Sequence, residues 1–205
     1  MAGKKESTFI NMVLVLFIIT LISGVALGGF YELTKEPIAA AKLAKKLNAI
    51  KEVVPEFNNN PSDEVYKVGI NATDTLEFYP AKMDNKLVGT AVKTFTNKGF
   101  AGYIWVMVGF LPDGTINNYS ILDHKETPGL GSKMGAWFKQ TDPAKEKSSV
   151  INKNPGTTKF IVSKDGGDID AITAATISSR AFMDAIQKGY NEYMKNKNKE
   201  EVSHE

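Results

Sequence analysis

The longest apolar segment of the chain runs over residues 9–30 and contains no charged residue; Asn11, Thr20 and Ser23 are its only clearly polar members. At 1.5 Å per residue, these 22 residues would form a helix of about 33 Å, which matches the roughly 30 Å hydrocarbon core of a bilayer. We therefore predict a transmembrane anchor helix at 9–30, preceded by a short tail at 1–8.

A cleaved secretory signal is the competing interpretation of this segment. Lys4 and Lys5 could form its basic start, and Ala26-Leu27-Gly28 is a passable cleavage site. The apolar part of a signal peptide rarely exceeds about 15 residues, so the length favours an uncleaved anchor. Basic residues lie on both sides of the segment, and their count does not decide its orientation.

The pattern after the anchor changes to a helical period. Leu43, Leu47, Ile50 and Val54 recur at helical spacing, and Pro37 fits the first turn of a helix. We predict a connecting helix within residues 31–56.

The middle of the chain alternates between short β-branched or aromatic segments and turns. Five strands are predicted, over residues 65–70, 75–79, 87–95, 103–111 and 116–122. Asp84-Asn85 and Pro112-Asp-Gly114 supply turns, and the last two strands are expected to form a hairpin at the centre of a sheet.

The rest of the chain is predicted to be mainly loop and helix. We expect a loop at 124–131, a short helix at 134–139, a strand at 160–162, a turn at 165–168, a final helix at 178–195 and a charged flexible tail at 196–205. Because strands dominate the middle and helices the ends, the predicted fold class is α+β, with a mostly antiparallel sheet.

Charge and composition narrow the possible functions. The chain has 25 basic and 23 acidic residues, of which two basic and one acidic residue precede residue 31. The part beyond the anchor therefore contains 23 basic and 22 acidic residues. This balance gives no case for binding nucleic acid. The absence of cysteine excludes disulfides, thiolate metal sites, cysteine-ligated iron–sulfur clusters and a cysteine nucleophile.

The segment Asp170-Ala-Ile-Thr-Ala-Ala-Thr176 places a hydroxyl among small residues directly before the final predicted helix. The start of a helix has unpaired N–H groups and partial positive charge, which favour a bound anion. The segment resembles the Dxx[ST]GAT-type flavinylation motif of the membrane-anchored flavoproteins of Rnf and Nqr ion-pumping complexes. Asp170, Thr173, Ala175 and Thr176 match this motif, whereas Ala174 stands where glycine is usual. The resemblance implies that Thr176 carries FMN through a phosphoester; a simple helix-capping role for its hydroxyl is the alternative.

The second motif is the predicted loop Glu126-Thr-Pro-Gly-Leu-Gly131. Its proline and two glycines make a stiff loop whose backbone can approach a ligand closely. The loop resembles the ETPGLG segment that lies beside FMN in the same family. Glu126, Thr127, Pro128, Gly129, Leu130 and Gly131 all match, although an ordinary turn remains the alternative.

Several acidic residues and one histidine could suggest a metal site or a hydrolase, but their spacing favours structural roles. Asp165, Asp168 and Asp170 lack the spacing of a calcium loop, so we expect turn acids and no resident metal site. Asp170 is the exception, because it belongs to the matched motif; the resemblance implies that it helps recognition by the flavin transferase or by a Mg²⁺ ion during transfer. Asp123 and His124 are adjacent in a predicted strand and point to opposite faces, and the GxSxG motif is absent, so no catalytic residue is expected.

Four large aromatic residues are expected in the core: Trp105, Phe110, Trp137 and Phe138. Trp137 and Phe138 follow the loop closely enough that they could instead flank a cofactor ring.

The resemblance implies an FMN-binding domain at 57–195 and the role of a G-type subunit in a membrane-bound Rnf complex. Such a complex couples electron transfer from ferredoxin to NAD⁺ with ion movement, and its A, B, C, D and E subunits would be the partners. A flavin transferase using FAD and Mg²⁺ would attach the FMN. The resemblance also implies a bacterial inner membrane location in the lipid bilayer, with the domain on the periplasmic face. The C subunit of a Na⁺-translocating NADH:quinone oxidoreductase and a membrane-tethered extracytoplasmic binding or scaffold module without a redox centre remain alternatives.

Overall fold

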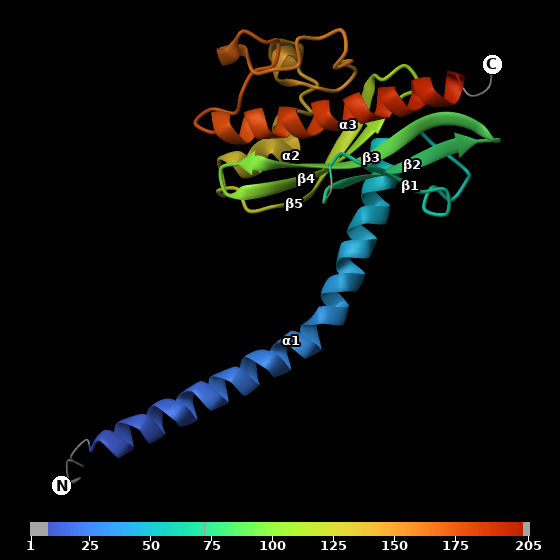
Figure 1. The fold of residues 1–205 in the computed structure, drawn as a ribbon. Coiled ribbons are helices and arrows are strands. Elements are labelled where there is room, and N and C mark those ends of the chain that lie inside the picture. The colour runs from blue at the N-terminus through green and yellow to red at the C-terminus, as the bar shows by residue number, and fades with distance from the viewer. Residues whose placement is uncertain (1–7, 72, 203–205) are drawn as a thin grey trace. The chain divides into compact units, whose positions relative to one another are not determined.

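The strands form a single antiparallel sheet in a computed structural model, which describes residues 8–71 and 73–202 (Figure 1). The sheet has the order β1-β2-β3-β4-β5, so neighbours in sequence are neighbours in space. Its strands are β1 (Tyr66–Gly69), β2 (Thr75–Met83), β3 (Lys86–Gly99), β4 (Gly102–Phe110) and β5 (Ile116–His124). All five predicted strands are present, and the α+β class is confirmed.

The two faces of the sheet bury alternate side chains. Phe78, Val92 and Val106 pack in the main core, whereas their neighbours Tyr79 and Ala91 pack in a smaller core. This alternation follows from the two-residue period of a strand. The helix α3 (Thr176–Val202) covers the main core, as Figure 1 shows. The smaller core is closed by the last turns of α1 (Phe9–Val53), through Ala49, Ile50 and Val53.

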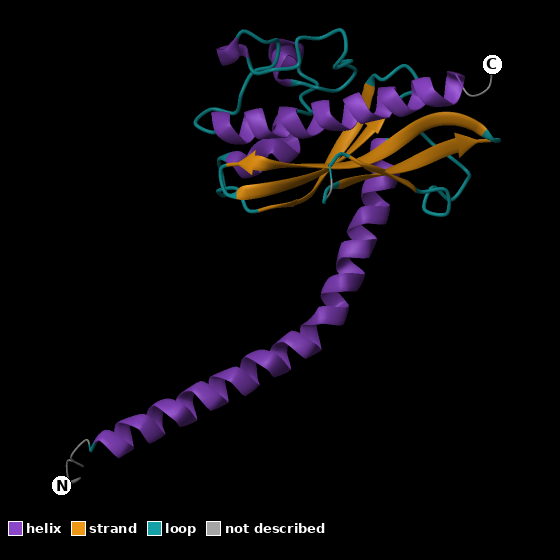
Figure 2. Ribbon diagram, in the orientation of Figure 1, coloured by secondary structure: helices purple, strands orange, loops and turns teal. Residues whose placement is uncertain are grey.

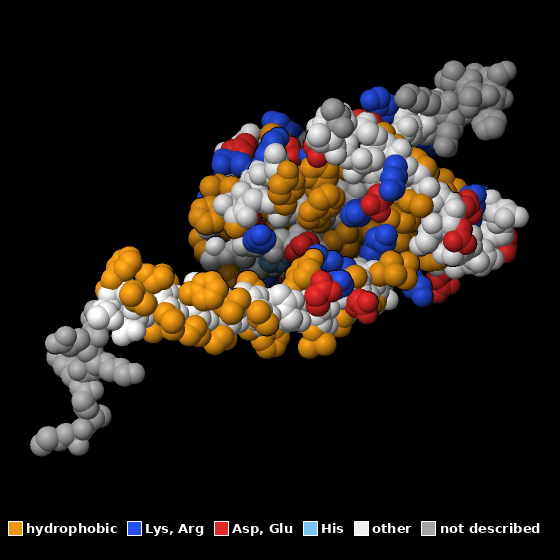
Figure 3. Space-filling model, turned by 60° about the horizontal axis from the view of Figure 1, so that its bottom comes forward, with side chains coloured by type: hydrophobic (Ala, Val, Ile, Leu, Met, Phe, Trp, Pro, Cys, Tyr) orange, Lys and Arg blue, Asp and Glu red, His pale blue; other side chains and the backbone are white. Residues whose placement is uncertain are grey.

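The helix α1 is long and apolar enough to cross a membrane. Figure 3 shows the hydrophobic side chains that cover its N-terminal stretch. The chain divides into two compact units, Met1–Ala44 and Lys45–Glu205, so α1 begins in the first unit and ends in the second. Residues 1–7 of the predicted tail, including the basic residues before the anchor, lie outside the described part of the chain.

The sequence pattern placed Pro37 in the first turn of a helix. In the structure Pro37 lies inside the continuous helix α1. A proline removes one intrahelical hydrogen bond and clashes with the preceding turn, which disfavours but does not always end a helix. The alanines that follow Pro37 are strong helix formers and favour continuation.

The predicted central position of the last hairpin is wrong. The strands β4 and β5 do form a hairpin, but β5 is an edge strand and β3 is the central strand. The strand β2 also runs past the predicted end at residue 79 and includes Pro80. The Pro80 carbonyl accepts a hydrogen bond from the Asn59 side chain, so the backbone N and O of Pro80 face Asn59 rather than β3. A missing N–H on that side costs the β2–β3 ladder nothing.

The connection between β5 and α3 is mostly irregular (Figure 2). It contains η1 (Gly131–Lys133), α2 (Met134–Trp137), η2 (Pro143–Ser148) and η3 (Ser163–Asp165). The strand predicted at 160–162 is absent; only a single bridge joins Val162 and Ile169, because no neighbouring strand offers a ladder here. The tail predicted to be flexible at 196–205 is helical up to Val202, and residues 203–205 lie outside the described chain. Its lysines and glutamates are good helix formers, which favours continuation of α3.

Candidate functional site

The two sequence motifs meet at one pocket of about 320 Å³. One wall comes from the loop after β5, and the other from the chain entering α3. The lining residues are Phe100, Glu126, Thr127, Leu130, Gly131, Ala174, Ala175, Thr176, Ile177 and Ser178. Ligand pockets in proteins commonly have volumes of about 300–1,000 Å³, so this one is large enough for a ring system.

Thr176 is the first residue of α3 and is half-buried at this pocket. Its hydroxyl oxygen accepts a hydrogen bond from the Lys164 ammonium, with 3.4 Å between Nζ and Oγ1. The nearby Ser179 hydroxyl accepts from the Ile172 N–H at 2.9 Å and donates to the Ala175 carbonyl at 2.9 Å. Ser179 thus stabilises the turn before α3 through two hydrogen bonds, whereas the Thr176 hydroxyl contacts the Lys164 ammonium.

Ala174 has a φ of +61°, in the left-handed region of the backbone. Only glycine adopts this region without steric cost, since a Cβ crowds the following carbonyl. The structure therefore explains why glycine is usual at this position of the motif. Alanine keeps the same turn and still leaves little bulk beside Thr176.

The loop at 126–131 closes on itself through short-range hydrogen bonds. The Thr127 carbonyl accepts from Leu130 N–H at 3.2 Å and from Ser132 N–H at 3.3 Å. The Gly129 N–H donates to the Ser132 hydroxyl at 2.9 Å, and Gly129 has a φ of +75°. The turn is thus built by its own backbone, as the Pro-Gly pattern predicted.

Glu126 is a buried carboxylate, only 4% exposed. One oxygen accepts from the Ala101 N–H at 3.0 Å, and the other accepts from the Ser178 hydroxyl. Gly131 packs against this pair: a Cβ on Gly131 would lie 2.7 Å from Oε2 of Glu126 and would also overlap Ser178. A side chain at residue 131 is therefore incompatible with the observed packing.

The remaining predicted site residues do not line the pocket. Asp170 accepts a hydrogen bond from the Ser163 hydroxyl at 2.6 Å, and its carbonyl accepts from the Trp137 indole at 3.1 Å. Thr173 is exposed in the turn before α3. Pro128 and Gly129 lie at the tip of the loop and are absent from the lining.

Three successive side chains attach the turn η3 to the segment that leads into α3 and to the first turns of that helix. Ser163 bonds to Asp170, Lys164 to Thr176, and Asp165 to Arg180. The Asp165–Arg180 pair is bidentate, with both N···O distances at 2.7 Å. Hydrogen bonds from Arg180 hold the pKa of Asp165 below its ordinary value. The sequence motifs did not single out Lys164, because its relation to Thr176 depends on how this irregular segment folds back.

Apolar side chains surround the mouth of the pocket. Phe100, Leu130 and Ile177 all line it and are 68%, 39% and 49% exposed. The sequence analysis missed Phe100, which lies in the tight turn between β3 and β4; a large aromatic residue in such a turn was the available signal. Phe138, considered as a ring-flanking residue, instead stacks on Phe182 in the core, with 4.5 Å between centroids.

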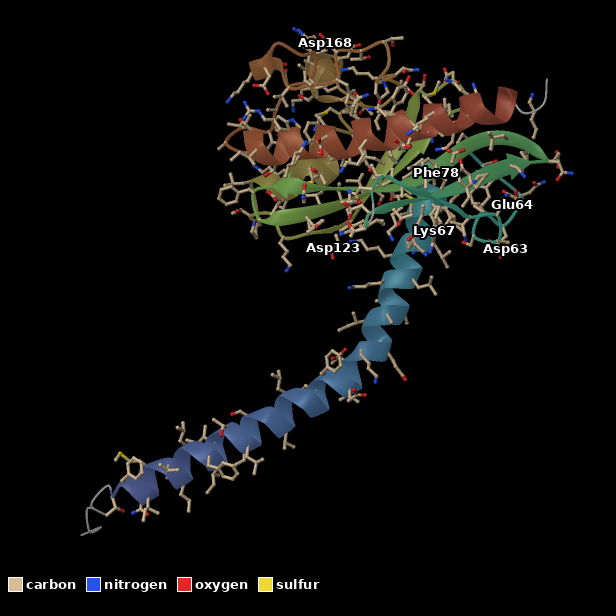
Figure 4. All side chains as sticks on the ribbon, in the orientation of Figure 1. Asp63, Glu64, Lys67, Phe78, Asp123 and Asp168 are labelled. Atoms are coloured by element: carbon tan, nitrogen blue, oxygen red, sulfur yellow. The ribbon has the colours of Figure 1, made fainter. Side chains whose placement is uncertain are left out.

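The acidic residues near η3 bond to neighbouring groups of the chain. Asp168, labelled in Figure 4, accepts the Lys159 N–H at 2.8 Å, whereas Asp165 and Asp170 have the partners described above. At the end of β5, where Asp123 is labelled in the same figure, the His124 Nδ1 accepts the Glu126 N–H at 3.1 Å. That contact connects the histidine ring to the backbone of the loop.

Comparison with known proteins places this site in a family. A family model described as FMN-binding domain matches residues 99–191, which include the loop, η3 and the start of α3. The G subunit of an ion-translocating oxidoreductase complex from Erwinia tasmaniensis is 32% identical over 76% of this chain and 75% of that protein. The chain belongs to this G-subunit family. The protein of the same description from Aliivibrio fischeri is 31% identical over 90% of this chain and 87% of its own length.

A third relative is the G subunit of the Na⁺-translocating ferredoxin:NAD⁺ oxidoreductase complex of Acetobacterium woodii. It is 32% identical over 88% of this chain and 89% of its own length. Membership of the G-subunit family, with an FMN-binding domain, makes the chain a redox subunit of an ion-translocating oxidoreductase complex. The expected resemblance to Rnf-type G subunits is confirmed.

Proposed function

We propose that Thr176 carries FMN through a phosphodiester and that the flavin ring lies in the pocket beside the loop at 126–131. The observation that carries this proposal is the position of the Thr176 hydroxyl, at the first residue of α3 and on the wall of the 320 Å³ pocket. The small side chains of Ala174 and Ala175 leave this hydroxyl approachable from outside. An attached phosphate would face the unpaired N–H groups at the start of α3, which stabilise an anion.

The attachment reaction that fits this site is a transfer from FAD by a flavin transferase with Mg²⁺. The Thr176 oxygen would form a new bond to the phosphorus on the FMN side of the FAD pyrophosphate. The pyrophosphate bond breaks, AMP leaves, and the hydroxyl proton passes to solvent or to a base of the transferase. No electrons are exchanged in this step.

The pocket residues suit a planar ring that must stay in one orientation. Phe100, Leu130 and Ile177 offer apolar contact, whereas the backbone of the loop offers polar groups along one wall. When bound, FMN supplies a centre that takes up and releases one or two electrons. The chain's own contribution is to hold the ring, to limit its contact with water and to present one edge to a neighbouring subunit.

In the assembled complex, we propose that the chain relays electrons among A-, B-, C-, D- and E-type subunits of an Rnf complex. The complex would transfer electrons from ferredoxin to NAD⁺ and move Na⁺ or H⁺. We further propose that α1 anchors the chain in the bacterial inner membrane, with the domain on the periplasmic face. A C subunit of a Na⁺-translocating NADH:quinone oxidoreductase would share the flavin attachment but have different partners.

The decisive experiment is expression of the full chain together with a flavin transferase, followed by intact mass and fluorescence on a denaturing gel. Wild-type protein should gain the mass of FMN less water and fluoresce. Thr176→Ala should remove both signals while the protein stays folded, and Thr176→Ser should retain part of them because the oxygen nucleophile remains.

Thr173→Ala tests the other hydroxyl of the motif; Thr173 is exposed and does not line the pocket, so this variant should still carry FMN on Thr176. Fluorescence that persists in Thr176→Ala and disappears in Thr173→Ala would move the attachment site to Thr173. A wild-type chain that never acquires flavin would favour a membrane-tethered binding or scaffold module instead.

Anchoring is tested separately by extraction. The full-length protein should resist release from membranes by salt and require detergent, whereas residues 31–205 should be soluble. Membrane association of that fragment without partner subunits would contradict a single anchor.

A further inference from the structure

We propose that the Lys164 ammonium binds the phosphate through which the flavin is attached to Thr176, so that Lys164 is a positioning residue for the cofactor. This inference rests on the proposed attachment at Thr176. Lys164 belongs to η3, outside both motifs that identified the site. Its role is to hold the attached phosphate at the start of α3.

The geometry that carries the inference is the direct contact between the two side chains. Lys164 Nζ lies 3.4 Å from Oγ1 of Thr176, the oxygen that would be esterified. A phosphodiester at this oxygen carries one negative charge, shared by the two non-bridging oxygens on the phosphorus bonded to Oγ1. The cation is thus already within reach of the atom to which that anion is joined, and charge-assisted bonds to phosphate are among the stronger hydrogen bonds.

Lys164 is held in this place from both sides along the chain. The preceding Ser163 donates its hydroxyl to Asp170 at 2.6 Å, and its N–H donates to the Ile169 carbonyl at 2.7 Å. The following Asp165 forms the bidentate pair with Arg180. Because both neighbours are attached to the segment that carries Thr176, the lysine backbone cannot move away from that segment independently.

The arrangement also assigns separate roles to the two cations on this side of α3. Arg180 already shares both oxygens of the Asp165 carboxylate. Lys164 instead contacts a neutral hydroxyl, which does not compensate its charge. Lys164 is therefore the cation that would neutralise the charge of the phosphate. Arg180 holds η3 in place through its ion pair with Asp165.

The test compares Lys164→Gln, Lys164→Arg and the control Lys159→Gln in full-length protein treated with flavin transferase, FAD and Mg²⁺. Lys159 is an exposed lysine on the same stretch of chain, so its variant matches the loss of charge. Covalent FMN is followed over time by intact mass, and peptide mapping locates it. Lys164→Gln should slow attachment by about tenfold, as expected when one charge-assisted contact is lost. Lys164→Arg should restore most of the rate, and Lys159→Gln should match wild type.

A second measurement separates phosphate binding from docking of the transferase. Prolonged treatment yields fully flavinylated protein, whose ³¹P resonance reports the surroundings of the phosphodiester. We expect a changed chemical shift in Lys164→Gln and an unchanged one in Lys159→Gln. The wild-type shift should respond to salt, because an exposed ion pair is screened.

The outcomes distinguish this inference from the proposed attachment. Wild-type rate and an unchanged ³¹P shift in Lys164→Gln, with FMN mapped to Thr176, would overturn the role of Lys164 and leave the attachment intact. Failure of wild-type protein to acquire FMN at Thr176 would overturn both. A slowed Lys164→Gln that Lys164→Arg fails to rescue would also contradict a role based on charge.

Discussion

The carboxylate of Glu126 accepts a hydrogen bond from the hydroxyl of Ser178, 52 residues further along the chain. Its other oxygen accepts the Ala101 N–H, so one buried side chain joins the β3–β4 turn, the loop after β5 and the first turn of α3. These are the three segments that form the pocket. The glutamate of the loop motif therefore has a structural role, because it holds the three segments around the pocket together.

Removing this carboxylate should destabilise the domain. In Glu126→Ala the Ala101 N–H and the Ser178 hydroxyl lose their acceptor inside the protein, which costs about 1–3 kcal/mol of unfolding free energy. Ser178→Ala retains the carboxylate and one of its donors, and should cost less, about 1 kcal/mol. Urea unfolding of the detergent-solubilised protein measures both values. Equal midpoints for Glu126→Ala and wild type would show that the buried contact contributes nothing to stability.

The strands of this fold could be predicted from sequence because their signals are local. Successive side chains of a strand point to opposite faces of the sheet, so Phe78 is buried in one core and Tyr79 in the other. The left-handed turn at Asp84 and Asn85 also follows from residue type, and both have positive φ as expected for a tight hairpin.

The arrangement around η3 could not be predicted in this way. The segment contains a single β-bridge instead of a ladder, so no periodic pattern marks how it folds back. The contact between Lys164 and Thr176 depends on two side-chain contacts that flank the lysine, made by Ser163 and Asp165. Residues of both motifs line the pocket, whereas Asp170 bonds to Ser163 and is not among the lining residues.

Ala174→Gly should be neutral or slightly stabilising. The left-handed conformation costs a non-glycine residue about 1–2 kcal/mol, and glycine loses about 0.5–1 kcal/mol through its greater freedom in the unfolded chain. The control Ala175→Gly removes a buried methyl group without relieving a positive φ, and should destabilise the protein by about 1 kcal/mol. Thermal unfolding of both variants checks the sign. A destabilised Ala174→Gly would show that the methyl group of Ala174 makes a contact that outweighs its backbone strain.

The Asp165–Arg180 pair should open only in acid. Arg180 lowers the pKa of Asp165 from the ordinary value of 3.8, so the pair is intact above that value and is lost as the pH falls through the lower folded-state pKa. Carboxyl ¹³C NMR of Asp165 measures this pKa directly. In Arg180→Gln the pKa should rise toward 3.8, and salt should raise it in wild type because both groups are exposed. An identical midpoint in wild type and Arg180→Gln would contradict the pairing.

The two glycines of the loop should respond differently to the same substitution. In Gly131→Ala the new Cβ would overlap Ser178 and lie 2.7 Å from Glu126 Oε2, so one pocket wall must move, at a cost of about 1–3 kcal/mol. In Gly129→Ala no atom lies within 4 Å of the new Cβ, and only the φ of +75° opposes it, at about 1 kcal/mol. With flavinylation confirmed by mass, Gly131→Ala should shift the flavin absorbance and midpoint potential, whereas Gly129→Ala should leave both close to wild type. If fully flavinylated Gly131→Ala keeps the wild-type spectrum and potential, the ring does not lie against this wall, and the loop serves only as a turn.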